Sequence, residues 1–145
     1  MKIAFAGAGY IINIHAKAAK AQKDVELVGV VERFSTEKSE ALAQKFKIKN
    51  RYDTVDQLLK SGNVDALVIG TPNFLHAPQA IAALKAGVHV MVEKPMALNA
   101  REAEKMLEAS AKSGATLMVA HCWRFDEDVL WLRNQSPRLG KIIRT

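Results

Sequence analysis

Apolar runs of strand length alternate with longer segments of helical periodicity along the whole chain. This alternation is typical of a parallel sheet whose strands are joined by crossover helices. Several of the short runs are apolar at nearly every position, as expected where helices cover both faces of a sheet. The pattern predicts an α/β protein with a Rossmann-type, doubly wound, mostly parallel sheet of about six strands.

The expected strands are Lys2–Ala6, Val25–Val31, Asn50–Tyr52, Val64–Ile69, Val88–Val92 and Thr116–Ala120. The expected helices are Ile11–Gln22, Thr36–Phe46, Val55–Ser61, His76–Ala86 and Ala100–Ser113. Glycines 62, 87 and 114 each follow a helical stretch, where a C-terminal glycine is favoured. Asn99 precedes the last of these helices, where asparagine is a favoured N-cap.

The composition narrows the class of protein. The chain has 145 residues, of which 49% are hydrophobic and 25% charged, as in a soluble globular domain. No apolar stretch approaches the roughly 20 residues of a membrane helix, so we expect a cytoplasmic protein with no membrane partner. The net charge of +6 comes from basic residues spread along the chain, with acidic residues beside many of them, so we expect no nucleic-acid partner. Cys122 is the only cysteine, which we expect to be buried, and no metal-ligand spacing is evident.

The last part of the chain departs from the alternating pattern. Asp126–Asp128 begins a further helix that carries the apolar run Val129–Leu132, and Lys141–Thr145 resembles the start of another strand. Four consecutive apolar residues cannot all lie on one face of a helix, so we expect this run to need a cover from outside the domain. The alternative is a tightly packed terminal helix. We assign residues 1–121 to a nucleotide-binding domain and 122–145 to a terminal segment.

A glycine-rich turn follows the first expected strand. Gly7 allows a tight turn, Gly9 lets a pyrophosphate approach the backbone, and the helix that begins near Tyr10 and Ile11 offers free N–H groups. Ile12 stands where glycine or alanine permits close packing of helix on strand. We expect its branched side chain to push the helix away or to turn toward the cofactor, which would weaken the pyrophosphate contact. A structural turn without a ligand is the alternative.

An acidic residue ends the second expected strand. Glu32 stands where a carboxylate accepts hydrogen bonds from the adenosine ribose and repels a 2′-phosphate, which favours NAD over NADP. The neighbouring Arg33 leaves NADP possible, because a guanidinium can bind that phosphate or lie over the adenine. Both residues could instead form a solvated strand end.

The fourth expected strand runs into a loop with short polar side chains. Thr71 and Asn73 bring polar groups to the sheet edge, Pro72 stiffens the turn, and His76 lies near the start of the next helix. We expect this loop to line the nicotinamide. A loop that merely caps the helix is the alternative reading.

The fifth and sixth strands bring further polar groups to the same edge. Glu93 and Lys94 follow the fifth strand, where Glu93 could position the lysine or balance its charge, although such a sequence alone also fits a surface turn. His121 follows the sixth strand, so we expect it at the same edge as a second catalytic residue beside Lys94, with Trp123 as a flat apolar wall. The alternative is that this segment only packs the domain boundary.

Taken in order, these motifs resemble the N-terminal domain of the Gfo/Idh/MocA family, which includes glucose-fructose oxidoreductase and inositol dehydrogenase. The resemblance covers nearly the whole chain and rests on Gly7–Gly9, His15–Ala16, Thr71–Asn73 with His76, Ala86–Val90, Glu93–Pro95 and Trp123–Phe125. It implies an NAD- or NADP-binding domain in which Lys94 stands beside the nicotinamide and handles the substrate proton. It also implies that the segment from His121 borders the cleft, with Arg124 as a contact for an anionic or polyol group. The implied reaction is hydride transfer between the cofactor and a sugar, polyol or related carbohydrate.

The resemblance also implies a second, α+β substrate domain, which this chain lacks. We therefore expect a truncated chain that binds cofactor but is weakly active or inactive alone, and the sequence leaves open whether the isolated chain is an enzyme. The alternative function is a cofactor-binding scaffold or sensor that forms a homodimer through its apolar C-terminal segment.

Overall fold

The computed structural model describes residues 1–138 and 140, which contain a six-stranded parallel sheet in the order β3-β2-β1-β4-β5-β6. The strands are β1 Lys2–Ala6, β2 Glu26–Val31, β3 Asn50–Tyr52, β4 Ala66–Ile69, β5 His89–Val92 and β6 Leu117–Val119. The helices are α1 Tyr10–Lys20, α2 Thr36–Phe46, α3 Val55–Lys60, α4 His76–Lys85, α5 Ala100–Ser113 and α6 Glu127–Gln135. This strand order is that of the Rossmann fold, so the expected fold class is confirmed.

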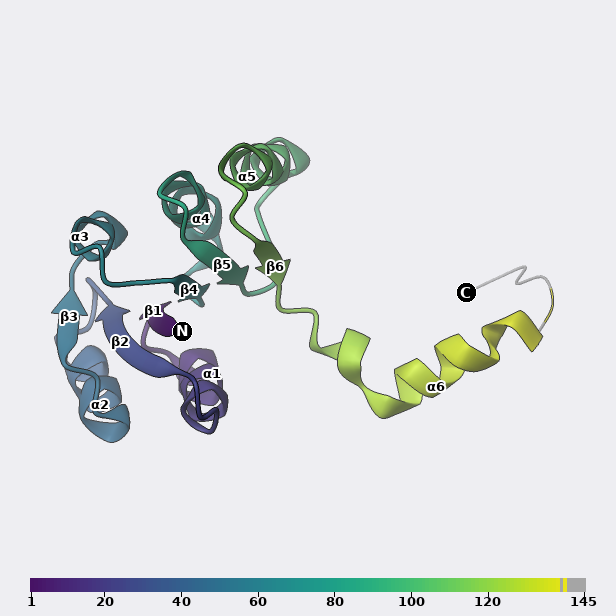
Figure 1. The fold of residues 1–145 in the computed structure, drawn as a ribbon, viewed down its shortest axis with the longest axis horizontal. Coiled ribbons are helices and arrows are strands. Elements are labelled where there is room, and N and C mark those ends of the chain that lie inside the picture. Colours follow the sequence, from purple (N-terminus) through teal and green to yellow (C-terminus); the bar gives the residue numbers. More distant parts are fainter. Residues whose placement is uncertain (139, 141–145) are drawn as a thin grey trace.

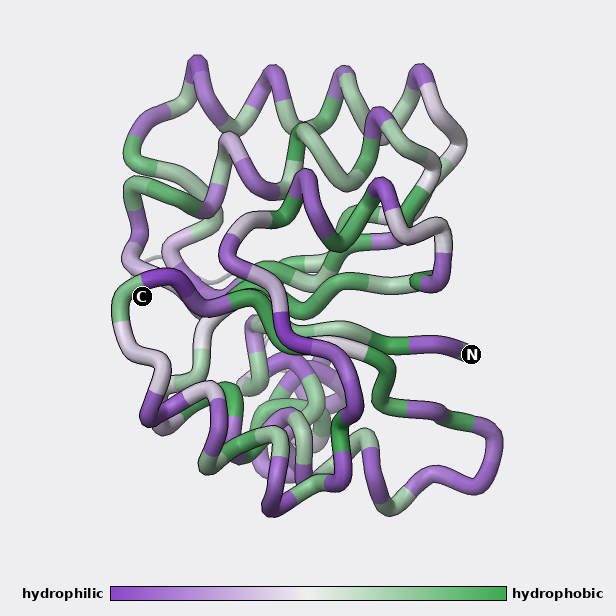
Figure 2. The backbone as a smooth tube through the Cα atoms, turned by 90° about the vertical axis from the view of Figure 1, so that its left-hand side faces the viewer, coloured by the Kyte–Doolittle hydropathy of each residue, from purple (hydrophilic) through white to green (hydrophobic). Residues whose placement is uncertain are grey.

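The sheet separates two apolar layers (Figure 1). Helices α1 and α2 cover one face, and α3, α4 and α5 cover the other. Phe5, Ile12 and Leu42 belong to the buried cluster on the α1 side, whereas Leu67 and Met106 belong to the cluster on the α4 side. Figure 2 shows the consequence for the chain: apolar segments concentrate in the central strands, while polar and apolar residues alternate along the surrounding helices.

Local signals fix the ends of the helices. The side chain of Asn99 accepts a hydrogen bond from the backbone N–H of Glu102 at 3.0 Å, which confirms it as the N-cap of α5. Gly114 ends the same helix with a φ of 74°, in the left-handed region that favours glycine. The observed boundaries differ from the expected ones by at most two residues. The loop expected after β4 contains a short 3-10 helix, Asn73–Leu75.

The C-terminal segment leaves the body of the domain (Figure 1). All residues of α6 are at least partly exposed, with Trp131 64% and Leu132 54% accessible, so the tightly packed terminal helix is wrong. Cys122 lies in a 3-10 helix before α6 and is exposed, not buried as expected, because the chain has already left the sheet there. The strand expected at Lys141–Thr145 lies outside the described residues. Within the described ranges, no helix is both long and apolar enough to cross a membrane.

The carboxyl ends of the strands lie in register at one edge of the sheet. Ala6 pairs with Val31 on one side and with Ile69 on the other, and the register continues through Val92 to Val119. Each residue that follows a strand end is therefore brought to the same level of the sheet. The order of the strands reverses between β1 and β4, which is where ligands bind in open α/β sheets.

Candidate functional site

The glycine turn after β1 presses against the end of β4. Gly7 has a φ of 98° and donates its N–H to the carbonyl of Val31 at 2.8 Å. A Cβ atom at Gly7 would lie 2.8 Å from the backbone oxygen of Gly70, which is closer than real Cβ contacts allow. Both the backbone conformation and the close approach therefore require glycine at position 7.

Ile12 does not disturb this turn, which differs from the sequence expectation. Its side chain is fully buried in the apolar cluster between α1 and the sheet. The room comes from Gly70, because a Cβ atom there would lie 2.8 Å from Cδ1 and 3.0 Å from Cγ1 of Ile12. The small residue that permits close packing of helix on strand thus stands on β4's side of the contact instead of on α1.

The N-terminus of α1 faces open space. Gly9 is the N-cap of the helix, and apart from Gly9 itself and its two chain neighbours no described residue has an atom within 4 Å of a Cβ built there. Within the same part of the chain, no side chain caps α1, and its first turn holds no acidic residue. The N–H groups at Tyr10, Ile11 and Ile12 are therefore available to an anionic group, and Tyr10 is 84% exposed beside them.

A cavity of about 270 Å³ opens beside this turn at the ends of β2, β3 and β4. It brings together four residues expected to bind cofactor, namely Glu32, Arg33, Thr71 and Pro72. One carboxylate oxygen of Glu32 accepts the backbone N–H of Phe34 at 2.9 Å, which fixes the direction of the carboxylate. Aspartates 53 and 56, which sequence reasoning missed, line the same cavity and add negative charge. Asp53 directly follows a strand, and that placement was the available signal.

A second cavity, of about 400 Å³, opens between α1 and the ends of β5 and β6. Its lining is mainly apolar and includes Ile11, Glu93, Lys94 and His121. The structure therefore brings the two expected catalytic residues, Lys94 and His121, into one pocket. The peptide bond between Lys94 and Pro95 is cis.

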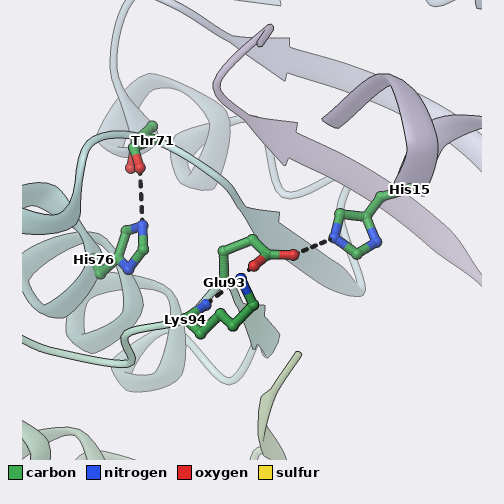
Figure 3. Close-up of polar contacts among 5 residues, drawn as sticks. All are labelled: His15, Thr71, His76, Glu93 and Lys94. Atoms are coloured by element: carbon green, nitrogen blue, oxygen red, sulfur yellow. Dashed lines mark hydrogen bonds and ion pairs between the residues drawn. The ribbon is translucent and has the colours of Figure 1, made fainter. Parts of the chain in front are cut away.

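His15 also lines this second cavity and contacts Glu93 (Figure 3). Its Nε2 lies 2.9 Å from Oε1 of Glu93, and the two side chains are only 19% and 12% exposed. The other oxygen of Glu93 accepts the backbone N–H of Lys94 at 3.1 Å. Sequence reasoning did not assign His15 a role, because 78 residues separate it from its partner.

His76 is buried, which differs from the cofactor contact expected for it. Only 1% of the residue is exposed, and both ring nitrogens face backbone carbonyls. Nε2 lies 2.8 Å from the oxygen of Thr71 (Figure 3), and Nδ1 lies 2.8 Å from the oxygen of Pro95. The ring thus joins the loop after β4 to the loop after β5, and α4 places it there because His76 is the first residue of that helix.

Besides the glycine turn, Tyr10, Ile12 and the buried His76, three more expected cofactor residues stand apart from both cavities. Of the described residues, Asn73, Trp123 and Arg124 line neither of them, and all three are exposed. Trp123 and Arg124 lie in the segment that leaves the sheet, so their contact with a cofactor stays a prediction. In the described part of the chain, no three His, Cys, Asp or Glu side chains lie close enough to hold a metal ion.

Comparisons with known proteins agree with this arrangement. Residues 1–121 match the Gfo/Idh/MocA oxidoreductase family, NAD-binding Rossmann fold. The chain belongs to this family, and residues 1–121 are the part that matches its NAD-binding Rossmann fold.

Three relatives illustrate the match. A 4-carboxy-2-hydroxymuconate-6-semialdehyde dehydrogenase from Sphingobium sp. is 35% identical over 93% of this chain and 42% of its own length. A D-glucoside 3-dehydrogenase from Escherichia coli is 32% identical over 100% of this chain and 42% of its own. The crystal structure of GenD2 from gentamicin A biosynthesis in complex with NAD superposes with a TM-score of 0.78 and 30% identity, over 82% of this chain and 34% of GenD2. The chain thus spans less than half the length of these relatives.

Proposed function

We propose that this chain is the cofactor-binding part of an oxidoreductase that moves a hydride between NAD and a small hydroxylated substrate. The observation that carries the proposal is the pair of cavities on either side of the β1–β4 switch point. One contains carboxylates suited to a ribose, and the other contains Lys94 and His121. Residues 1–121 would form the cofactor domain, and 122–145 the start of a further part of the protein.

The residues between the cavities fit a dinucleotide. Gly9 leaves room above the backbone, and the uncapped N-terminus of α1 supplies N–H groups to a pyrophosphate. A bound nicotinamide would supply the hydride acceptor. GenD2, which has been crystallised with NAD, supports this use of the fold.

The charge of the first cavity favours NAD over NADP. Glu32, Asp53 and Asp56 all line it, whereas Arg33 is the cation among its lining residues in the described chain. Because a 2′-phosphate carries up to two negative charges, its approach to three carboxylates costs free energy that a ribose hydroxyl avoids.

Lys94 is suited to handle the proton of the substrate hydroxyl. Its side chain is exposed to the second cavity, so its uncharged amine can accept that proton while the substrate carbon loses a hydride. His121 lines the same cavity and offers a second polar contact to the substrate. The apolar walls of Ile11 and Met91 limit the water that surrounds the reacting groups.

The substrate class follows from the relatives and from the polar groups of the second cavity. The relatives act on a glucoside and on a carboxylated hydroxymuconate semialdehyde, according to their names. We propose a sugar, polyol or related carbohydrate, and the proposed setting is the cytoplasm without nucleic-acid or membrane partners.

Titration with NADH and NADPH, followed by energy transfer from protein tryptophan to the reduced nicotinamide, tests the proposal. We expect saturable binding with preference for NADH. Glu32→Gln keeps an oxygen for the N–H of Phe34 but removes the charge, so it should reduce the preference for NADH over NADPH. Lys94→Ala should leave NADH binding largely intact. Absence of saturable binding to the wild-type chain would refute the proposed function.

A second candidate function is self-association through α6. The exposed run Val129–Leu132 supports it, because four adjacent apolar side chains that are 38–64% accessible favour a partner surface. We propose a second copy of the chain as that partner. Sedimentation equilibrium of the wild type and Trp131→Glu tests this: a dimer that the substitution dissociates supports it, and a monomeric wild type refutes it.

A further inference from the structure

We infer that His15 is a positioning residue that holds Lys94 in place through Glu93. The inference rests on the proposed role of Lys94 and deepens it. It assigns a function to the contact between His15 of α1 and Glu93 after β5, which has no role in the cofactor binding and proton transfer proposed above.

The contact forms a continuous chain of hydrogen bonds (Figure 3). A carboxylate only accepts hydrogen bonds, so Nε2 of His15 donates to Oε1 of Glu93 over 2.9 Å. Oε2 of Glu93 in turn accepts the backbone N–H of Lys94 over 3.1 Å. Both oxygens of one carboxylate are thus engaged, and the side chain of Glu93 cannot rotate without losing one of the two contacts.

The burial of the pair gives the contact its strength. The two side chains are 19% and 12% exposed, and apolar residues of the second cavity surround them. A hydrogen bond to a charged group in such surroundings is stronger than one between neutral groups in water. A partly buried Glu93 carboxylate that lost one of its two hydrogen bonds would destabilise the fold. The fold therefore favours the Glu93 rotamer that reaches both His15 and the N–H of Lys94.

Glu93 acts on the backbone of Lys94 and not on its side-chain nitrogen. Among the described residues, no ion pair joins the Lys94 side chain to an acidic group, whereas its N–H contact to Glu93 is present. The side-chain Nζ of Lys94 therefore stays available to the cavity while its Cα is fixed. Of the two roles that the sequence left open for Glu93, this geometry supports positioning over charge balance.

His76 secures the next peptide from the opposite helical layer. It belongs to α4, whereas His15 belongs to α1, and the two helices cover opposite faces of the sheet (Figure 1). Its Nδ1 lies 2.8 Å from the carbonyl oxygen of Pro95, the residue after Lys94. Lys94 is thus held on its amino side through Glu93 and on its carboxyl side through Pro95.

The motion of the Lys94 backbone amide tests the inference directly. The full chain, labelled with ¹⁵N-lysine, gives one amide signal per lysine, and Lys94→Arg identifies the signal of Lys94. We expect its order parameter to be about 0.85 in the wild type and to fall below about 0.6 in His15→Leu, which lacks a donor. His15→Gln keeps a donor of similar reach and should restore the value to within about 0.1 of the wild type.

Lys2 provides a matched control in the same spectra. Its backbone N–H also donates to a carboxylate, that of Asp65 at 2.7 Å, and 63 residues of sequence separate these partners. Its order parameter should not change in either variant. If Lys94 stays as ordered in His15→Leu as in the wild type, or if His15→Gln loosens it as much as leucine does, the inference is refuted.

A second variant covers the case in which His15→Leu fails to fold. Glu93→Met keeps a side chain of similar length but has no oxygen for either partner, so Lys94 should loosen there too. NADH titration of the wild type runs in parallel. A wild type that does not bind NADH would refute the proposed function, whereas the amide measurement judges the positioning role by itself.

Discussion

Replacing Gly70 with alanine would place a methyl group against Ile12, which makes this pair a test of how the glycine turn is packed. The new Cβ would lie 2.8 Å from Cδ1 and 3.0 Å from Cγ1 of Ile12, and 3.0 Å from Cγ2 of Ile11. Ile12 is fully buried between α1 and the sheet, so it has no solvent-filled space into which to move. Either α1 shifts or the side chain leaves its preferred rotamer.

The magnitudes can be estimated for each change. Overpacking of this kind lowers the free energy of unfolding by about 1–3 kcal/mol. The less flexible unfolded chain of an alanine variant raises it by about 0.4–1 kcal/mol. Ile12→Val alone leaves a small void and costs about 0.5–1.5 kcal/mol. Because valine lacks Cδ1, the atom in the shortest contact, the double variant should be more stable than the sum of the two single losses by about 1 kcal/mol.

Urea unfolding followed by far-ultraviolet circular dichroism measures the four free energies of unfolding in this cycle. The tryptophans are less suitable probes, because Trp123 and Trp131 both lie in the segment that leaves the sheet. Additive losses within about 0.5 kcal/mol would mean that the two positions do not share one space. That result would refute the account in which Gly70 makes room for Ile12.

Three further substitutions test other parts of the turn and of the helix ends. Gly9→Ala should leave the free energy of unfolding within about 0.5 kcal/mol of the wild type, because no described residue beyond its chain neighbours lies within 4 Å of the new methyl group. The same variant should weaken NADH binding at least about tenfold, because the methyl group fills the space for the pyrophosphate. Gly7→Ala should destabilise the domain by about 2 kcal/mol or more in the same urea assay, since the φ of 98° and the contact with Gly70 oxygen both oppose a side chain; an unchanged midpoint would contradict this. Asn99→Ala removes the N-cap of α5 and should cost about 1 kcal/mol, and Asn99→Asp, which keeps a capping oxygen, should not.

Much of the fold could be predicted because its signals are local. Asn99 and Gly114 mark the two ends of α5 within the helix's own sequence, and apolar runs mark the strands. The role of Ile12 could not be found in this way. The space that it occupies is provided by Gly70, which lies 58 positions further along the chain, so inspection of the turn alone suggests a conflict that the folded domain does not have.

In the candidate site, too, the features with a local sequence signal could be predicted and those that depend on distant residues could not. Strand ends predicted the placement of Glu32 and Lys94 at one edge, because parallel strands in register bring their carboxyl ends together. The contacts that hold the neighbours of Lys94 come from opposite layers, because His15 of α1 reaches Glu93 and His76 of α4 reaches Pro95. No local pattern distinguishes the buried His76, with both nitrogens on carbonyls, from a histidine that faces a ligand.

The two cavities lie on opposite sides of the sheet edge, which explains why the glycines concentrate between them. The cavity with Glu32 is lined by residues of α3 and α4, and the cavity with Lys94 by residues of α1. A single ligand that reaches both must cross the edge between β1 and β4, where Gly7 and Gly70 are in contact and Gly9 leaves the backbone open. A side chain at any of these three positions would narrow that crossing or move the strands apart. In the proposed binding mode, the absence of side chains there leaves room for one dinucleotide to connect the carboxylate pocket on one face with the lysine on the other.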